Sequence, residues 1–84
     1  MIIKKEITSN IKDQLAEIIE THGKRVWLKT ISLYWEKYDI YLILWCNKVF
    51  MYSQTENGEV IKGLFDRFND DDLYEIIEKY SEIT

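Results

Sequence analysis

The stretch from residue 26 to residue 55 reads VWLKTISLYWEKYDIYLILWCNKVFMYSQT, and it decides the fold. Aromatic and β-branched residues recur along it, and turn signals interrupt it at regular intervals, which is typical of an antiparallel meander. We predict three strands here, at residues 26–35, 40–46 and 49–55. A fourth strand is expected at residues 60–66, because Asn57-Gly58 supplies the two positive φ angles of a tight hairpin before it.

One segment has a competing interpretation. The large apolar side chains of residues 24–38 also recur at helical spacing: Trp27, Ile31, Tyr34, Trp35 and Tyr38. A helix there would leave a three-stranded sheet. We prefer the strand, because the expected loop lengths then agree on a single apolar face of the sheet.

Amphipathic helices are predicted on both sides of the meander. The first covers about residues 10–22, with one apolar face formed by Ile11, Leu15, Ile18, Ile19 and His22. Ser9 or Asn10 can cap its start, and Gly23 can end it in the left-handed conformation. Ile3 and Ile7 either extend this helix backward or form a separate short segment.

The second helix is predicted from Asp70 to Tyr80 or beyond. Its apolar stripe consists of Leu73, Ile76, Ile77 and Tyr80. Three aspartates occupy the first turn, where the helix dipole favours negative charge. Asp72 with Glu75 three residues later resembles a capping box.

These elements predict the fold class. The chain has 84 residues, which fits one domain covering residues 1–84. We expect a two-layer α+β domain, in the order helix, four-stranded antiparallel meander sheet, helix. Both helices are expected to pack on the aliphatic face of the sheet.

The expected loops fix which residues share a face of the sheet. A two-residue loop at Asn47-Lys48 and a four-residue loop at 36–39 place the aliphatic residues together. This core face collects Ile31, Leu33, Trp35, Ile40, Leu42, Leu44, Cys46, Val49, Met51 and Leu64. The opposite face collects Thr30, Ser32, Tyr34, Tyr41, Ile43, Trp45, Phe50, Tyr52, Ile61 and Phe65.

The aromatic members of the second face are candidate partner-binding residues: Tyr34, Tyr41, Trp45, Phe50, Tyr52 and Phe65. Aromatic side chains on an exposed sheet face suit an interface, because they are apolar with one polar handle. Three interpretations are open. The helices straddle the sheet and this face is a second core, a second copy covers it in a homodimer, or a foreign partner covers it.

Charge is unevenly distributed along the chain. Eleven basic and fifteen acidic side chains give a formal charge of -4, which argues against general affinity for nucleic-acid backbones. The acidic excess lies in the C-terminal segment. Its candidate partner-binding residues are Asp70, Asp71, Asp72 and Glu75.

The sequence offers little for catalysis or for a cofactor. His22 and Cys46 are the sole histidine and the sole cysteine, and Cys46 is expected on the apolar core face. The aspartate run after residue 65 lacks the glycine and glutamate spacing of a calcium-binding EF-hand loop. We expect no metal and no cofactor. One cysteine and the lack of a long apolar run favour a cytoplasmic protein without a membrane anchor.

The sequence-based hypothesis is a small acidic, non-enzymatic binding, adaptor or inhibitor protein. It would act by protein contact through the aromatic sheet face and the acidic segment, with a homodimer as one arrangement. Two alternatives remain. Single-stranded nucleic acid could stack on the aromatic face, or oligomerisation could complete an enzymatic or ligand-binding domain.

Overall fold

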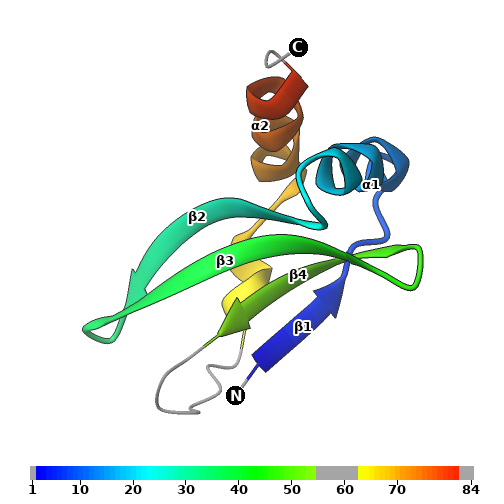
Figure 1. Ribbon diagram of the computed structural model, residues 1–84. Coiled ribbons are helices and arrows are strands. Elements are labelled where there is room, and N and C mark those ends of the chain that lie inside the picture. The colour runs from blue at the N-terminus through cyan, green and yellow to red at the C-terminus, as the bar shows by residue number, and fades with distance from the viewer. Residues whose placement is uncertain (1, 55–62, 82–84) are drawn as a thin grey trace.

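The computed structural model describes residues 2–54 and 63–81. Seven elements follow one another along the chain (Figure 1). They are β1 (Ile2–Glu6), α1 (Lys12–Thr21), β2 (Arg25–Leu33), β3 (Glu36–Trp45), β4 (Lys48–Gln54), the 3₁₀ helix η1 (Leu64–Arg67) and α2 (Asp70–Ser81). The four strands form one antiparallel sheet in the order β1-β4-β3-β2.

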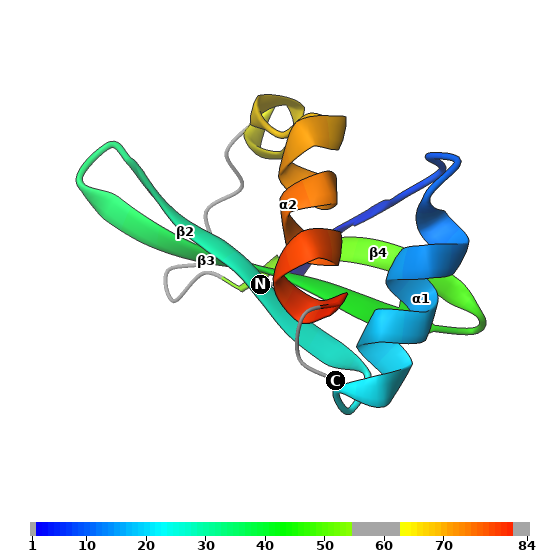
Figure 2. The same cartoon turned by 90° about the horizontal axis from the view of Figure 1, so that it is seen from above.

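This architecture confirms the predicted class, an α+β fold with two helices and a four-stranded antiparallel sheet. The helical interpretation of residues 24–38 is wrong, because β2 and the start of β3 occupy this segment. Both helices lie on the same side of the sheet (Figures 1 and 2). The straddling arrangement is therefore also wrong.

The fourth strand of the described sheet is β1. The strand predicted at residues 60–66 is not seen where the structure describes that segment. Residues 60–62 lie outside the described residues, and residues 64–66 belong to η1. Leu64 and Phe65 are neighbours in the chain and both are buried, which suits a helical turn and not the alternation of a half-exposed strand. Gly63, with φ of 79°, turns the chain into η1.

Both hairpin turns are two residues long and shift the predicted pairing. The β2–β3 turn is Tyr34-Trp35 and the β3–β4 turn is Cys46-Asn47. The shifts are even, so most residues keep their predicted face of the sheet. Trp35 and Cys46 do not, because they lie in the turns and are exposed where a core position was expected.

The helices cover a continuous aliphatic core. The two most buried side chains of α1 are Leu15 and Ile19, and the sheet contributes Ile40 and Leu42, all with no exposed surface. A β-bulge between Trp27 and Lys29 lets the first half of β2 bury Val26 and Leu28 while its second half directs odd-numbered residues inward. This packing leaves the other face of the sheet to polar and aromatic side chains.

Helix ends follow the sequence signals in part. Gly23 ends α1 with φ of 93°, as predicted. The capping box of α2 begins three residues earlier than predicted and is formed by Asn69 and Asp72. Asn69 Oδ1 accepts from the Asp72 N–H at 3.3 Å, and Asp72 Oδ2 accepts from the Asn69 N–H at 3.0 Å.

Candidate interaction surface on the outer face of the sheet

The outer face is the side of the sheet opposite α1 and α2. Alternation along each strand assigns its members. Among the residues with described side chains, they are Lys4, Glu6, Arg25, Trp27, Thr30, Ser32, Lys37, Asp39, Tyr41, Ile43, Trp45, Lys48, Phe50, Tyr52 and Gln54. Among the described elements, neither long helix covers this face (Figure 2).

Four aromatic rings gather at the centre of the outer face. Tyr41 and Tyr52 face each other across β3 and β4, with ring centroids 5.6 Å apart. Trp45 and Phe50 lie beside them with centroids 6.1 Å apart. We call these four residues the aromatic cluster. Trp45 is its most accessible member, with 57% of its surface exposed, whereas Tyr52 is 9% exposed.

Two cations lie over rings of the aromatic cluster. The Lys4 Nζ atom is 4.2 Å from the Trp45 ring centroid, and the guanidinium carbon of Arg25 is 4.2 Å from the Tyr41 centroid. Each contact stabilises its pair by about 0.5–1 kcal/mol at an exposed site. The ring faces of Trp45 and Tyr41 are therefore already partly occupied.

The charge of the outer face differs in sign from that of the whole chain. Among the described residues, four cations lie on it, Lys4, Arg25, Lys37 and Lys48, against the two carboxylates Glu6 and Asp39. The Glu6 carboxylate lies 3.8 Å from Lys48 Nζ, and Asp39 accepts a hydrogen bond from Thr30. The face thus combines an apolar aromatic centre with a mildly basic surround.

The structure brings together four of the six predicted aromatic residues: Tyr41, Trp45, Phe50 and Tyr52. Phe65 is not among them, which corrects its predicted place on the aromatic face. Its ring is buried on the helix side and contributes to the core with Leu64 and Met51. The reason is that η1 replaces the expected fourth strand, so strand alternation does not apply to Phe65.

Tyr34 occupies a separate position at the tip of the β2–β3 hairpin. Tyr34 and Trp35 have φ angles of 48° and 70°, a conformation that bulky side chains rarely adopt. Tyr34 is 79% exposed and Trp35 is fully exposed. The hairpin extends away from the helices (Figure 2), so both rings are presented at its end.

Sequence reasoning missed Lys4 and Arg25. Lys4 lies on β1, a strand that had not been assigned, so its face could not be deduced. Arg25 directly precedes the predicted first strand, and simple alternation from Ile31 and Leu33 would have placed it on the core face. The β-bulge between Trp27 and Lys29 puts Arg25 on the outer face instead. Its pairing with Ile43 puts it beside Tyr41.

The predicted acidic residues separate into two groups. Asp70, Asp71 and Glu75 are exposed on α2, on the helix side of the molecule. Asp72 is half-buried and accepts a hydrogen bond from Lys29 Nζ at 2.7 Å. Burial raises the pKa of Asp72. The hydrogen bonds that Asp72 accepts from Lys29 and from the Asn69 N–H, together with the positive charge of Lys29, lower this pKa by more. The pKa of Asp72 therefore lies below its usual value.

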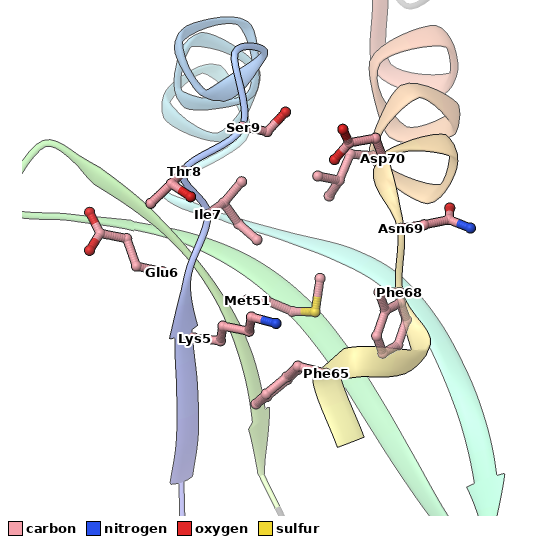
Figure 3. A pocket seen from close by; sticks show the side chains of 11 residues that line it. Lys5, Glu6, Ile7, Thr8, Ser9, Met51, Phe65, Phe68, Asn69 and Asp70 are labelled. Carbon is pink, nitrogen blue, oxygen red and sulfur yellow. The ribbon is translucent and has the colours of Figure 1, made fainter. Parts of the chain in front are cut away.

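A concavity lies between β1, η1 and the start of α2. It encloses about 260 Å³. Figure 3 shows Met51, Phe65 and Phe68 lining it, with Lys5 and Ser9 at its margin. Lys5 forms an ion pair with Asp66 at 3.3 Å beside it. The lining combines these apolar side chains with polar ones, which include Glu6, Thr8, Asn69 and Asp70.

The sole histidine lines a groove between α1 and α2. The groove encloses about 360 Å³ and includes Glu17, Tyr80 and Ser81 among its lining residues. The His22 ring packs edge-on against the Tyr80 ring at 4.8 Å. Cys46 lies in the β3–β4 turn and is exposed, so its predicted place on the core face is wrong.

Comparison of the chain with protein-family models, with curated proteins and with solved structures finds no match. Within the described part of the chain, no helix is both long enough and apolar enough to cross a membrane.

Proposed function

We propose that the protein binds another protein through the aromatic cluster on the outer face and acts as an adaptor or inhibitor by contact. The observation that supports this is the aromatic cluster itself, which lies on the side of the sheet opposite both helices. Aromatic side chains backed by a rigid sheet provide large contact area with little loss of side-chain freedom. Trp45 is the expected central anchor.

The charged residues around the aromatic cluster indicate the chemistry of the partner. Lys4, Arg25, Lys37 and Lys48 favour a partner surface that carries carboxylates around an apolar centre. On the helix side, Asp70, Asp71 and Glu75 form a second, acidic surface that would speed encounter with a basic protein. An adaptor could use both surfaces, because they lie on opposite sides of the domain.

Protein contact is favoured over single-stranded nucleic acid by the geometry of the rings. Stacking of bases needs free ring faces. Lys4 lies over Trp45 and Arg25 lies over Tyr41, while Tyr52 has little exposed surface. The exposed surface of Trp45 remains for packing against apolar protein side chains.

The enzymatic alternative would need a closed polar cavity near His22. The space beside His22 in the described residues is the groove between α1 and α2, where His22 packs against Tyr80. No observation there favours catalysis. A reducing compartment such as the cytoplasm remains the expected location, because the chain has a single cysteine.

Site-specific photocrosslinking tests the proposal. A photoreactive phenylalanine analogue at Trp45 should crosslink a discrete protein in extracts of the native host. The matched control is the same analogue at Tyr74, which is 48% exposed on α2. The protein captured from Trp45 alone is then purified, and Trp45→Ala should weaken its binding at least about tenfold, as expected for an interface anchor.

Two results would contradict the proposal. One is equal capture from Trp45 and Tyr74, which would mean that the outer face is not selective. The other is tight, salt-dependent binding of a labelled single-stranded oligonucleotide that Trp45→Ala abolishes, which would favour nucleic acid as the ligand.

A further inference from the structure

The two edges of the sheet differ in how they are protected. Among the described strands, β1 and β2 form the edges. β1 is five residues long and carries Lys4, Lys5 and Glu6, and such charges discourage pairing with another strand. β2 is nine residues long, and its last four residues, Thr30 to Leu33, are uncharged.

Hydrogen-bond direction shows which groups of β2 point outward. The Leu44 N–H donates to the Lys24 carbonyl at 3.1 Å, so Leu44 directs its backbone groups toward β2. Alternation along β3 means that Ile40, Tyr38 and Glu36 do the same. Their partners on β2 are Lys29, Ile31 and Leu33. Thr30 and Ser32 therefore direct their N–H and carbonyl groups away from β3.

The first half of β2 is engaged differently. The Tyr80 hydroxyl donates to the Trp27 carbonyl at 3.4 Å, and Lys79 Nζ lies 4.9 Å from the Trp27 ring centroid. The β-bulge also interrupts the edge between Trp27 and Lys29. Considering only residues 2–54 and 63–81, the open part of the edge is thus confined to the segment next to the aromatic hairpin tip.

We propose that this segment binds a second copy of the chain by antiparallel pairing of the two β2 strands. The twofold axis passes between the two Ile31 residues, which face each other as a non-hydrogen-bonded pair. Thr30 of each copy then faces Ser32 of the other, and these pairs exchange four backbone hydrogen bonds. The product is an eight-stranded sheet with α1 and α2 of both copies on one side.

This register is complementary in side chains as well as in backbone. Ile31 is half-buried and would meet an identical side chain, and Lys29 would lie opposite Leu33, so no like charges meet. The hydroxyls of Thr30 and Ser32 would lie on the outer face. The tip of each hairpin would reach the level of Trp27 in the other copy, where 42% of the Trp27 surface is exposed.

The dimer does not depend on the proposed function. Edge pairing leaves the aromatic cluster of each copy open, so two clusters would face the same side of one continuous sheet. A monomeric protein could still bind a partner through Trp45, and a dimeric one could lack any partner there.

Sedimentation of the full chain over a range of concentrations tests the dimer. Wild type should show a reversible monomer–dimer equilibrium. Ser32→Pro removes the outward N–H without removing a β2–β3 bond, because proline is tolerated on an edge strand where its N side faces solvent. It should raise the dimer dissociation constant about ten- to hundredfold, since two of the four intermolecular hydrogen bonds are lost.

The matched control is Glu6→Pro on the other edge. Ile7 N–H donates to the Val49 carbonyl at 2.8 Å, so Glu6 directs its own N–H away from β4. This variant should dimerise like wild type. A strictly monomeric wild type, or equal loss of dimer in both proline variants, would overturn the proposal.

Disulfide formation checks the register and does not depend on proline tolerance. With Cys46→Ser as background, Ile31→Cys should form a covalent dimer on mild oxidation. Facing residues of a non-hydrogen-bonded pair have Cα atoms about 4.5 Å apart, within disulfide range. Thr30→Cys, which would face Ser32, should crosslink far less. Equal crosslinking of the two variants would contradict this register.

Discussion

Strand alternation gives the sheet two faces with different roles. One face is a buried core and the other is an exposed surface. On the helix side, Ile40, Leu42 and Leu15 have no exposed surface and hold the domain together. On the outer face, Trp45, Tyr41 and Phe50 keep exposed surface and are held by each other and by cations. Large apolar side chains therefore occur on both faces, but only one face is a core. The difference predicts that stability and binding respond to different substitutions.

The largest expected effect is a core truncation. Leu42→Ala should lower the free energy of unfolding by about 2–5 kcal/mol, because it removes packed methyl groups and leaves a cavity. Urea denaturation followed by circular dichroism measures the loss. A cost below about 1 kcal/mol would mean that Leu42 is not a core residue, and the contrast between the faces would fail.

A stabilising change is expected at the hairpin tip. Replacing Tyr34-Trp35 by Asn-Gly should raise the free energy of unfolding by about 1–2 kcal/mol, because Asn and Gly accept positive φ at lower cost. Thermal and urea unfolding measure the gain. A loss of stability would show that the two aromatic rings make contacts that outweigh the strain of the turn.

The ion pair between Lys29 and Asp72 predicts a pH dependence on the helix side. The pKa of Asp72 is lowered in the folded protein, so its contribution is present above the unfolded-state pKa of about 4 and is lost as pH falls through the folded value. Asp72→Asn should cost about 1 kcal/mol at pH 7. Urea denaturation at pH 7 and at pH 2 should show this difference shrinking, and a difference independent of pH would contradict it.

The smallest effect on stability is expected at the outer face. Trp45→Ala should lower the free energy of unfolding by less than about 1 kcal/mol, since Trp45 is more than half exposed and loses mainly its contacts with Lys4 and Phe50. Comparing the loss in free energy of unfolding for Trp45→Ala with that for Leu42→Ala distinguishes a binding anchor from a core residue. A cost as large as that of Leu42→Ala would make the outer face a second core.

The sequence predicted the two faces better than it predicted the connections between strands. Leu42 and Trp45 were placed on opposite faces because alternation depends only on parity, and the errors in loop length were even. Tyr34-Trp35 was not recognisable as a turn, because neither residue prefers positive φ. The pattern of bulky residues there favoured a strand but also fitted a helix.

Local sequence patterns could not predict which strands far apart in the chain pair with each other. Ile3 and Ile7 were left between two interpretations, since a short N-terminal strand acquires its identity from β4, far along the chain. The same error hid Lys4 from the candidate site and gave Phe65 a place on the wrong face. The partner-binding roles of the aromatic cluster and of Asp70, Asp71 and Glu75 stay predictions.

The pairing of β1 with β4 also has a consequence for how the chain folds. The hairpins β2–β3 and β3–β4 close over two-residue turns, so they can form early from neighbouring residues. The contact between Ile7 and Val49 closes a much longer loop and loses more chain entropy. We therefore expect β1, which is synthesised before the other three strands, to join the sheet last. It can pair only after the β3–β4 hairpin has been synthesised.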